Sequence, residues 1–223
     1  MSRTKLKDRQ LPRYSKGEEV FNMVTHIVGG GVGIATLVLC IVFGAIHRNI
    51  YGIVSGAVFG LTMICLYTMS SIYHGLHKGT AKKVMQIIDH CTIYILIAGT
   101  YTPFCLCVLR EYKTWLGWTV FGTIWGLAIL GIVLNAIDLR SFRVISMVLY
   151  IGMGWCIIFT VKILFQYIGV SGMALLVSGG IAYTIGAILY GMGRKLKWMH
   201  SIFHIFVVIG SVCHSLSIIL CLM

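Results

Sequence analysis

The chain has 223 residues, of which 58% are hydrophobic and 11% charged, and its formal net charge is +12. Soluble domains have an apolar share of about half or less, so this composition excludes a soluble globular protein and indicates a membrane protein with several spans. The positive charge predicts no nucleic-acid partner, because basic residues in a tail and in short loops between apolar segments are typical of membrane proteins.

The first 19 residues form a basic tail that we expect to be cytoplasmic and uncleaved, because it lacks the short apolar core of a signal peptide. After the tail come apolar segments long enough for an α-helix to cross the hydrocarbon core, which takes about 20 residues. The fold-class prediction is therefore an all-α integral membrane protein in which residues 20–222 form a single seven-helix bundle. The seven expected spans cover residues 20–46, 50–75, 84–109, 115–136, 143–167, 171–192 and 199–222.

Charges in the loops predict the orientation, because Lys and Arg remain on the cytoplasmic side of a membrane. With the N-terminus inside, the outer side carries only Arg48, Arg110, Lys113 and Lys162. The sequence therefore predicts a cytoplasmic N-terminus and a C-terminus outside. The fourteen basic residues on the inner side are Arg3, Lys5, Lys7, Arg9, Arg13, Lys16, Lys78, Lys82, Lys83, Arg140, Arg143, Arg194, Lys195 and Lys197.

Glycines recur every four residues in the second expected span, at Gly52, Gly56 and Gly60, and in the first, at Gly29 and Gly33. Small residues at this spacing let helix backbones approach closely. We favour tight packing inside one bundle over a dimerisation face, and the oligomeric state is left open.

Four ionisable residues are expected at one depth near the cytoplasmic surface: His74 ends the second span, Asp89 lies one turn into the third, and His200 and His204 begin the seventh. Ionisable groups inside a membrane are costly and mark a functional site by default. Four-residue spacing places His200 and His204 on one helix face, and likewise Ser70 and His74. Three imidazoles with an open fourth position are typical of catalytic zinc, so we predict a Zn²⁺ site in which Asp89 orients the metal-bound water or accepts its proton. Interhelical hydrogen bonds are the alternative.

These residues carry a resemblance to a known family. Residues 70–74 (SSIYH), 89–103 (DHCTIYILIAGTYTP) and 200–204 (HSIFH) look like the motifs of the hemolysin III family. That family is the bacterial branch of the progestin and adipoQ receptors and is grouped with the alkaline ceramidases. The resemblance covers about residues 15–222.

The resemblance implies a seven-helix protein of a bacterial plasma membrane, with zinc in the cytoplasmic leaflet. It implies that His74, His200 and His204 hold the metal, that the aspartate at position 89 contacts a water on it, and that Ser70 lies beside it.

Other polar residues are expected to be secondary to this site. Glu18, Asn22 and His26 recur every four residues in the first span and resemble an E-x-x-x-N-x-x-x-H motif of the family. They either border the metal or join the first span to its neighbours, and we favour the latter. His90 follows Asp89 and points roughly 100° away, so we favour a packing or surface role over support of the metal.

Three further residues are expected to lie outside the site. His214 lies some 15 Å beyond His204 along the helix, which is too far to share the metal. Glu19 and Asp138 fall near membrane surfaces, so solvation is their default interpretation.

Three functions follow as hypotheses. The first is a zinc-dependent hydrolase of amide or ester bonds in a fatty-acyl membrane lipid, acting in membrane lipid homeostasis, with Asp89 as general base and Ser70 as donor to the oxyanion. The second is a non-enzymatic sensor or receptor-like protein with structural zinc. The third is the pore-forming cytolysin that the family name suggests, against which the absence of a continuous polar stripe argues.

Overall fold

The computed structural model describes residues 4–193 and 196–223, so Arg3, Arg194 and Lys195 of the predicted inner basic set lie outside the described residues. The described elements are all helices, which confirms the all-α prediction. The short ones are η1 (Leu6–Asp8), η2 (Phe104–Leu109), α4 (Arg110–Tyr112) and η3 (Cys156–Thr160). The long ones are α1 (Lys16–Ile46), α2 (Ile50–Gly75), α3 (Thr80–Pro103), α5 (Thr114–Asp138), α6 (Arg143–Trp155), α7 (Val161–Met192) and α8 (Met199–Leu222).

Side-chain caps set the starts of the first two long helices. The Ser15 hydroxyl accepts a hydrogen bond from the Glu18 backbone N–H, and the Glu18 carboxylate accepts one from the Ser15 backbone N–H at 2.9 Å. This capping box satisfies two N–H groups that the helix itself leaves unpaired. It explains why α1 begins at Lys16, ahead of the apolar segment that starts at residue 20. Asn49 caps α2 by accepting from the Gly52 N–H at 2.8 Å.

The third span changes its helical geometry at Pro103. The α-helix ends there and continues as the π-helical segment η2 and then as α4. Proline has no backbone N–H and its ring clashes with the preceding turn, so a regular α-helix does not continue through it. The predicted span 84–109 is thus one continuous helical run with a change of pitch near its end.

The segment Arg143–Met192 decides how the spans are counted. Six helical runs among the described residues are long and apolar enough to cross a membrane, and this segment counts as one of them. It is interrupted by η3 and by Gly169, whose φ of 62° and ψ of −168° lie outside the helical region. Gly169 falls between the predicted spans 143–167 and 171–192. The described residues therefore contain six long apolar helical runs, or seven when the segment is divided at this glycine.

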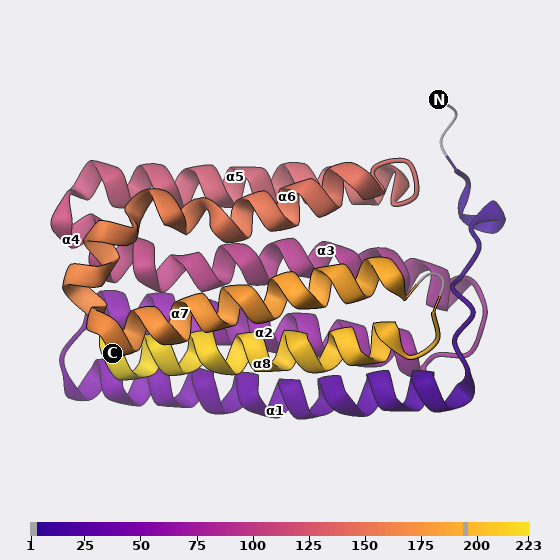
Figure 1. Cartoon of the computed structure of the whole chain (residues 1–223), viewed down its shortest axis with the longest axis horizontal. Helices are drawn as coiled ribbons and strands as arrows, with labels where there is room; N and C mark the ends of the chain where they lie inside the picture. Colours follow the sequence, from indigo (N-terminus) through magenta and orange to yellow (C-terminus); the bar gives the residue numbers. More distant parts are fainter. Residues whose placement is uncertain (1–3, 194–195) are drawn as a thin grey trace.

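The chain turns back between α6 and α7, as Figure 1 shows at the left-hand end of the bundle. In the same view α1 begins at one end and α8 finishes at the opposite end. An odd number of passes gives this arrangement, whereas six passes would return the chain to the end at which it started. The orientation of the bundle in a membrane stays a prediction.

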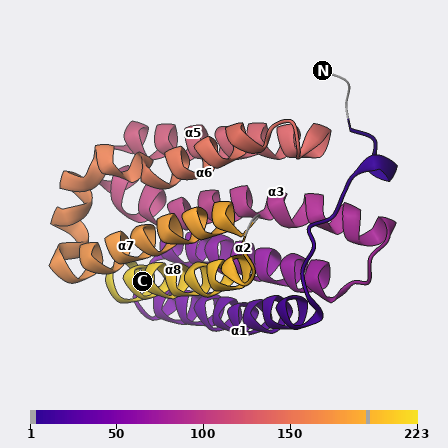
Figure 2. The same ribbon diagram turned by 45° about the vertical axis from the view of Figure 1, so that its right-hand side comes forward.

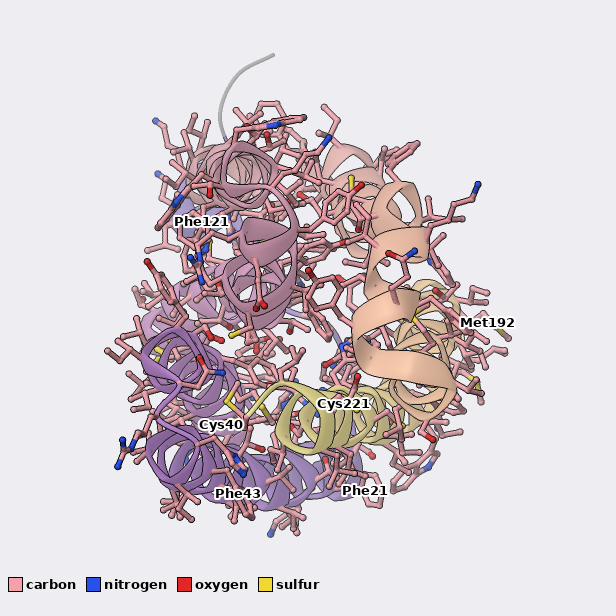
Figure 3. All side chains as sticks on the ribbon, turned by 90° about the vertical axis from the view of Figure 1, so that its left-hand side faces the viewer. Phe21, Cys40, Phe43, Phe121, Met192 and Cys221 are labelled. Atoms are coloured by element: carbon pink, nitrogen blue, oxygen red, sulfur yellow. The ribbon has the colours of Figure 1, made fainter. Side chains whose placement is uncertain are left out.

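The bundle is closed by contacts between its first and last helices. α1 packs on α2 and on α8, α7 packs on α8, and α3 lies between α2 and α5 (Figures 1 and 2). Figure 3 looks along the helices and shows Phe43 and Met192 on the outer surface, with Cys40 turned inward. Phe43 is 37% and Met192 41% exposed, whereas Cys40 is fully buried. An exterior of large apolar side chains is suited to contact with lipid.

The glycine stripe of α2 serves packing inside this bundle. A Cβ atom at Gly60 would lie 2.7 Å from the Leu37 Cα, and one at Gly56 would lie 2.4 Å from the Cys40 Cβ. Both neighbours belong to α1, so the two backbones approach too closely for any larger residue at these positions. The predicted packing role of Gly56 and Gly60 is confirmed.

Candidate metal centre

Three histidines from two helices meet at the end of the bundle where α1 and α8 begin. His74 lies in the last turn of α2, and His200 and His204 lie in the first two turns of α8. Their exposed fractions are 3%, 6% and 1%. Each offers one ligand atom, and these three atoms lie within 4.8 Å of one another. The fold therefore brings together the three residues that the sequence singled out.

The ring nitrogens of this cluster fit a metal ion. His200 Nε2 and His204 Nε2 are 3.2 Å apart. Two nitrogens bound tetrahedrally to one metal at 2.0–2.1 Å would lie about 3.3 Å apart, which is close to this spacing. His74 Nε2 is buried and has no hydrogen-bond partner among the described residues. A buried polar atom without a partner is costly, and a metal ion would satisfy it. The three histidines can hold a metal ion.

Glu19 orients His74 from α1. Its Oε2 atom lies 2.7 Å from His74 Nδ1, and its Oε1 atom lies 2.8 Å from the Lys82 ammonium. Because a carboxylate only accepts, the proton of neutral His74 resides on Nδ1 and the Nε2 lone pair is left for a metal. Lys82 is 3% exposed and also donates to the Leu76 carbonyl at 3.0 Å. The buried Lys82 thus positions the Glu19 carboxylate, which in turn orients His74.

The interpretation of Glu19 as a solvated residue is wrong, because its side chain is only 18% exposed and bonds to His74. The sequence contained a signal for this contact. Glu19, Asn22 and His26 are spaced at i, i+3 and i+7, which places them on one helix face. The spacing of Glu18, Asn22 and His26 at i, i+4 and i+8 fits one face equally well. Only the rotation of α1 in the bundle decides which glutamate faces the cluster.

The other polar residues of α1 have separate places. Asn22 Nδ2 lies 3.5 Å from His74 Nδ1, and the His26 ring stacks on His204 with centroids 3.8 Å apart. Glu18 instead accepts from the Trp198 backbone N–H at 2.7 Å, joining the start of α1 to the start of α8. Asn22 and His26 therefore border the three histidines, while the Glu18 side chain is engaged in capping and in this link.

Ser70 lies on α2, and Asp89 and His90 lie on α3. Ser70 is 1% exposed and lies one turn before His74 on α2. Asp89 Oδ2 is 3.6 Å from His90 Nδ1, and among residues 4–193 and 196–223 no hydrogen bond or ion pair joins Asp89 to the three histidines. His90 Nδ1 donates to the Gln86 carbonyl at 2.8 Å, and its Nε2 lies 3.0 Å from the Tyr190 hydroxyl. The catalytic roles of Asp89 and Ser70 stay predictions.

Tyr14 covers the cluster from the N-terminal segment. The sequence predicted only a basic tail for this segment. Its ring stacks on His200 with centroids 4.8 Å apart and planes at 16°. Burial raises the pKa of the Tyr14 phenol far above its usual value, and the charges of Glu19 and Asp89 act in the same direction. Tyr14 is therefore a neutral cover over His200.

Asp138 holds this segment in place. The Thr4 backbone N–H donates to the Asp138 carboxylate at 2.8 Å. Asp138 is 2% exposed, so its interpretation as a solvated residue is also wrong. Lys83 adds a second tie by donating to the Lys7 carbonyl at 2.7 Å.

We expect Glu19→Gln to weaken metal binding by about 10- to 100-fold, the usual effect of removing the group that orients a histidine ligand. The amide has nearly the same shape but loses the charge that fixes the Nδ1 proton of His74. Competition with a chelator of known affinity measures the effect on purified protein. The matched control is Glu111→Gln, because Glu111 is an exposed glutamate on α4. This variant should bind metal normally. Equal affinities for both variants would contradict the orienting role.

Fold and site together define a multi-pass membrane protein with a buried three-histidine cluster. The sequence profile of the family described as "Haemolysin-III related" matches residues 14–215, so the chain belongs to this family. The resemblance of the three motifs is thereby confirmed.

Several curated proteins are similar to the chain over most of its length. "Hemolysin-3" of Bacillus cereus is 41% identical over 194 residues, which cover 87% of each chain. "Hemolysin-3 homolog" of Bacillus subtilis is 40% identical over 194 residues, which cover 87% of this chain and 89% of that protein. The human "Monocyte to macrophage differentiation factor" is 22% identical over 166 residues, which cover 70% of this chain and 66% of that protein. No solved structure matches the chain.

Proposed function

We propose that this protein is a zinc-dependent hydrolase that cleaves amide or ester bonds of lipids in the cytoplasmic leaflet of a bacterial plasma membrane. The observation that supports this function is the buried set of three histidines in which His74 Nε2 has no partner among the described residues. Three imidazoles with an open fourth position are the ligand set of many catalytic zinc sites. Zinc supplies Lewis acidity there, polarising a carbonyl and activating water at neutral pH.

Four residues of this chain would then have separate roles in the reaction. Glu19 holds His74 with its free nitrogen toward the cluster. Asp89 accepts a proton from the attacking water, and the Ser70 hydroxyl donates to the oxygen that gains negative charge. Tyr14, stacked on His200, shields the site from bulk water on the side of the N-terminal segment.

An apolar cavity of about 140 Å³ supports a fatty-acyl substrate. It lies among α3, α6, α7 and α8, and its wall includes Tyr190 and Phe203. The Tyr190 ring lies 5.7 Å from the His200 ring, and the Phe203 ring lies 5.5 Å from the His204 ring, between centroids. Two side chains thus separate the cavity from the histidines, so an acyl chain in it would lie next to the metal centre.

The test is lipid hydrolysis by the purified full chain in liposomes. We expect zinc-loaded protein to release fatty acid from at least one member of a panel of ceramides, acyl-amides and phospholipids, as measured by mass spectrometry. Chelation should abolish the release and added zinc should restore it. Protein that carries one zinc per chain and releases no fatty acid from any of these lipids would contradict the hydrolase.

The burial of all three histidines favours a second candidate, a sensor or receptor-like protein in which the metal joins α2 to α8. In that case zinc removal should lower the thermal unfolding temperature sharply while no lipid is hydrolysed. The two Bacillus relatives are called hemolysins, which suggests a third candidate. Leakage of liposome contents with a defined size limit would support a pore.

A further inference from the structure

A basic cavity of about 520 Å³ lies at the same end of the bundle as the histidines. It is enclosed by the N-terminal segment, α3, the turn between α5 and α6, and the end of α7. Arg9, Arg13, Arg140 and Arg143 line it, and none of its described lining residues is acidic. A wall with four guanidinium groups and no carboxylate is suited to an anion, because guanidinium pairs well with phosphate and carboxylate.

Among the described residues, carboxylates leave three of these four arginines without an ion pair. Within residues 4–193 and 196–223, no ion pair joins Arg13, Arg140 or Arg143 to an acidic side chain. The carboxylate of Asp138 lies close by in sequence, but it accepts from the backbone N–H groups of Thr4 and Arg140 and so serves the turn. The guanidinium groups of Arg13, Arg140 and Arg143 are therefore available to a ligand.

The basic cavity adjoins the apolar one. Both are lined by His90, Met147, Tyr150 and Tyr190. Hydrogen bonds frame this shared wall, since the Tyr150 hydroxyl donates to the His90 carbonyl at 2.7 Å and the Tyr190 hydroxyl lies 3.0 Å from His90 Nε2. The two cavities thus share a wall of mostly hydrogen-bonded side chains, with arginines on one side of it and apolar side chains on the other.

The apolar cavity has the length and surface for a hydrocarbon chain. It follows α3 from His90 to Tyr101, a helix rise of about 16 Å. Most polar groups on its wall are satisfied by the protein: Tyr101 donates to the Met153 carbonyl at 2.7 Å, and Trp155 donates to Thr184 at 3.0 Å. His214 Nδ1 is the exception and has no partner among the described residues. Little hydrogen-bonding capacity is left for a polar ligand, so this space favours an apolar one.

We propose that the two cavities bind one anionic glycerophospholipid, with its phosphate among the arginines and an acyl chain in the apolar cavity. Tyr14 lines the basic cavity and stacks on His200, so the lipid would lie beside the metal centre. The proposal rests on the proposed function in one respect, because it makes this lipid the substrate class of the metal centre. A free phosphate ion would meet the same arginines but would leave the apolar cavity unused.

The first test compares the binding of three ligands by native mass spectrometry of the zinc-loaded full chain. The ligands are dioctanoyl phosphatidylglycerol, dioctanoyl phosphatidylcholine and inorganic phosphate. We expect the anionic lipid to bind about tenfold or more tightly than the zwitterionic one, because its net charge matches the arginines. The double variant Arg140→Gln, Arg143→Gln should lose this preference while keeping its zinc.

The matched control is Lys16→Gln, Lys78→Gln, which removes two exposed charges from the same end of the bundle but lies outside the cavity. It should bind phosphatidylglycerol as the unmodified chain does. Equal binding of the two lipids by the unmodified chain would overturn the proposal. So would an equal loss of preference in both double variants, because the basic surface as a whole would then attract the lipid.

The second test fills the apolar cavity with Ala187→Phe, using Ala136→Phe on the exposed face of α5 as the control. Ala187→Phe should weaken binding of the dioctanoyl lipid and leave inorganic phosphate unaffected. Phosphate bound as tightly as the lipid, with no effect of Ala187→Phe, would overturn the lipid as occupant. Selective binding of phosphatidylglycerol by a zinc-loaded chain that hydrolyses no lipid of the panel would contradict only the proposed function. Hydrolysis of neutral lipids without phosphatidylglycerol binding would overturn only this proposal.

Discussion

Replacing His200 by alanine is expected to remove the metal from the protein. Two imidazoles would remain where catalytic zinc sites use three protein ligands. Removing a group that only orients a ligand lowers metal affinity by up to about 100-fold. Removing a ligand itself should lower the metal affinity by more than this. Elemental analysis of the purified, dialysed variant should therefore find well under one metal ion per chain. Lipid hydrolysis should disappear in the same preparation.

His214→Asn is the matched control for this experiment. His214 lies on the same helix, is 8% exposed, and has its Nε2 atom 3.1 Å from the Leu176 carbonyl, outside the cluster. Asparagine keeps a donor at this position, so the variant should retain one metal ion per chain. A metal content that is normal in His200→Ala, or lost in His214→Asn, would show that His74, His200 and His204 are not the metal site.

The second large effect is expected from Asp89→Asn. The amide has the shape of the carboxylate but accepts no proton, so turnover should fall by about 10²- to 10⁴-fold, the usual contribution of a general base. The metal content should stay at one ion per chain, since among the described residues no hydrogen bond or ion pair joins Asp89 to the three histidines, and Asp89 Oδ2 lies 3.6 Å from His90 Nδ1. Initial rates of fatty-acid release and elemental analysis of the same sample measure both quantities.

Asp8→Asn provides a control at the same end of the bundle, because Asp8 is exposed on the N-terminal segment. It should turn over lipid at the unmodified rate. Full activity of Asp89→Asn would exclude Asp89 as the proton acceptor. If Asp89→Asn lost the metal together with the activity, Asp89 would instead be a residue that helps to hold the metal ligands in place.

Much of the site could be predicted from local features of the sequence. His200 and His204 share a face because four residues make about one helical turn, and His74 stood out because histidine is costly in an apolar span. The runs of apolar residues predicted the helices, and Gly169 falls where two of them were expected to separate. These properties depend on nearest neighbours along the chain, which is why they could be read without a structure.

Other features depend on how the helices are rotated and how the chain returns on itself. More than a hundred residues separate His74 from His200, and only the packing of α2 and α8 in one bundle brings their rings to 5.4 Å between centroids. The choice of Glu19 over Glu18 as the partner of His74 follows from the rotation of α1. That rotation is set by close contacts such as Gly60 against Leu37.

The sequence by itself determined the class of protein, the helical spans and the three histidines, because apolar length, helical period and the cost of buried charge are local quantities. Only the tertiary structure decided that Tyr14 covers His200, that Glu19 orients His74, and that a basic cavity adjoins an apolar one. Each of these joins residues from different elements, and their meeting depends on the packing of the whole bundle.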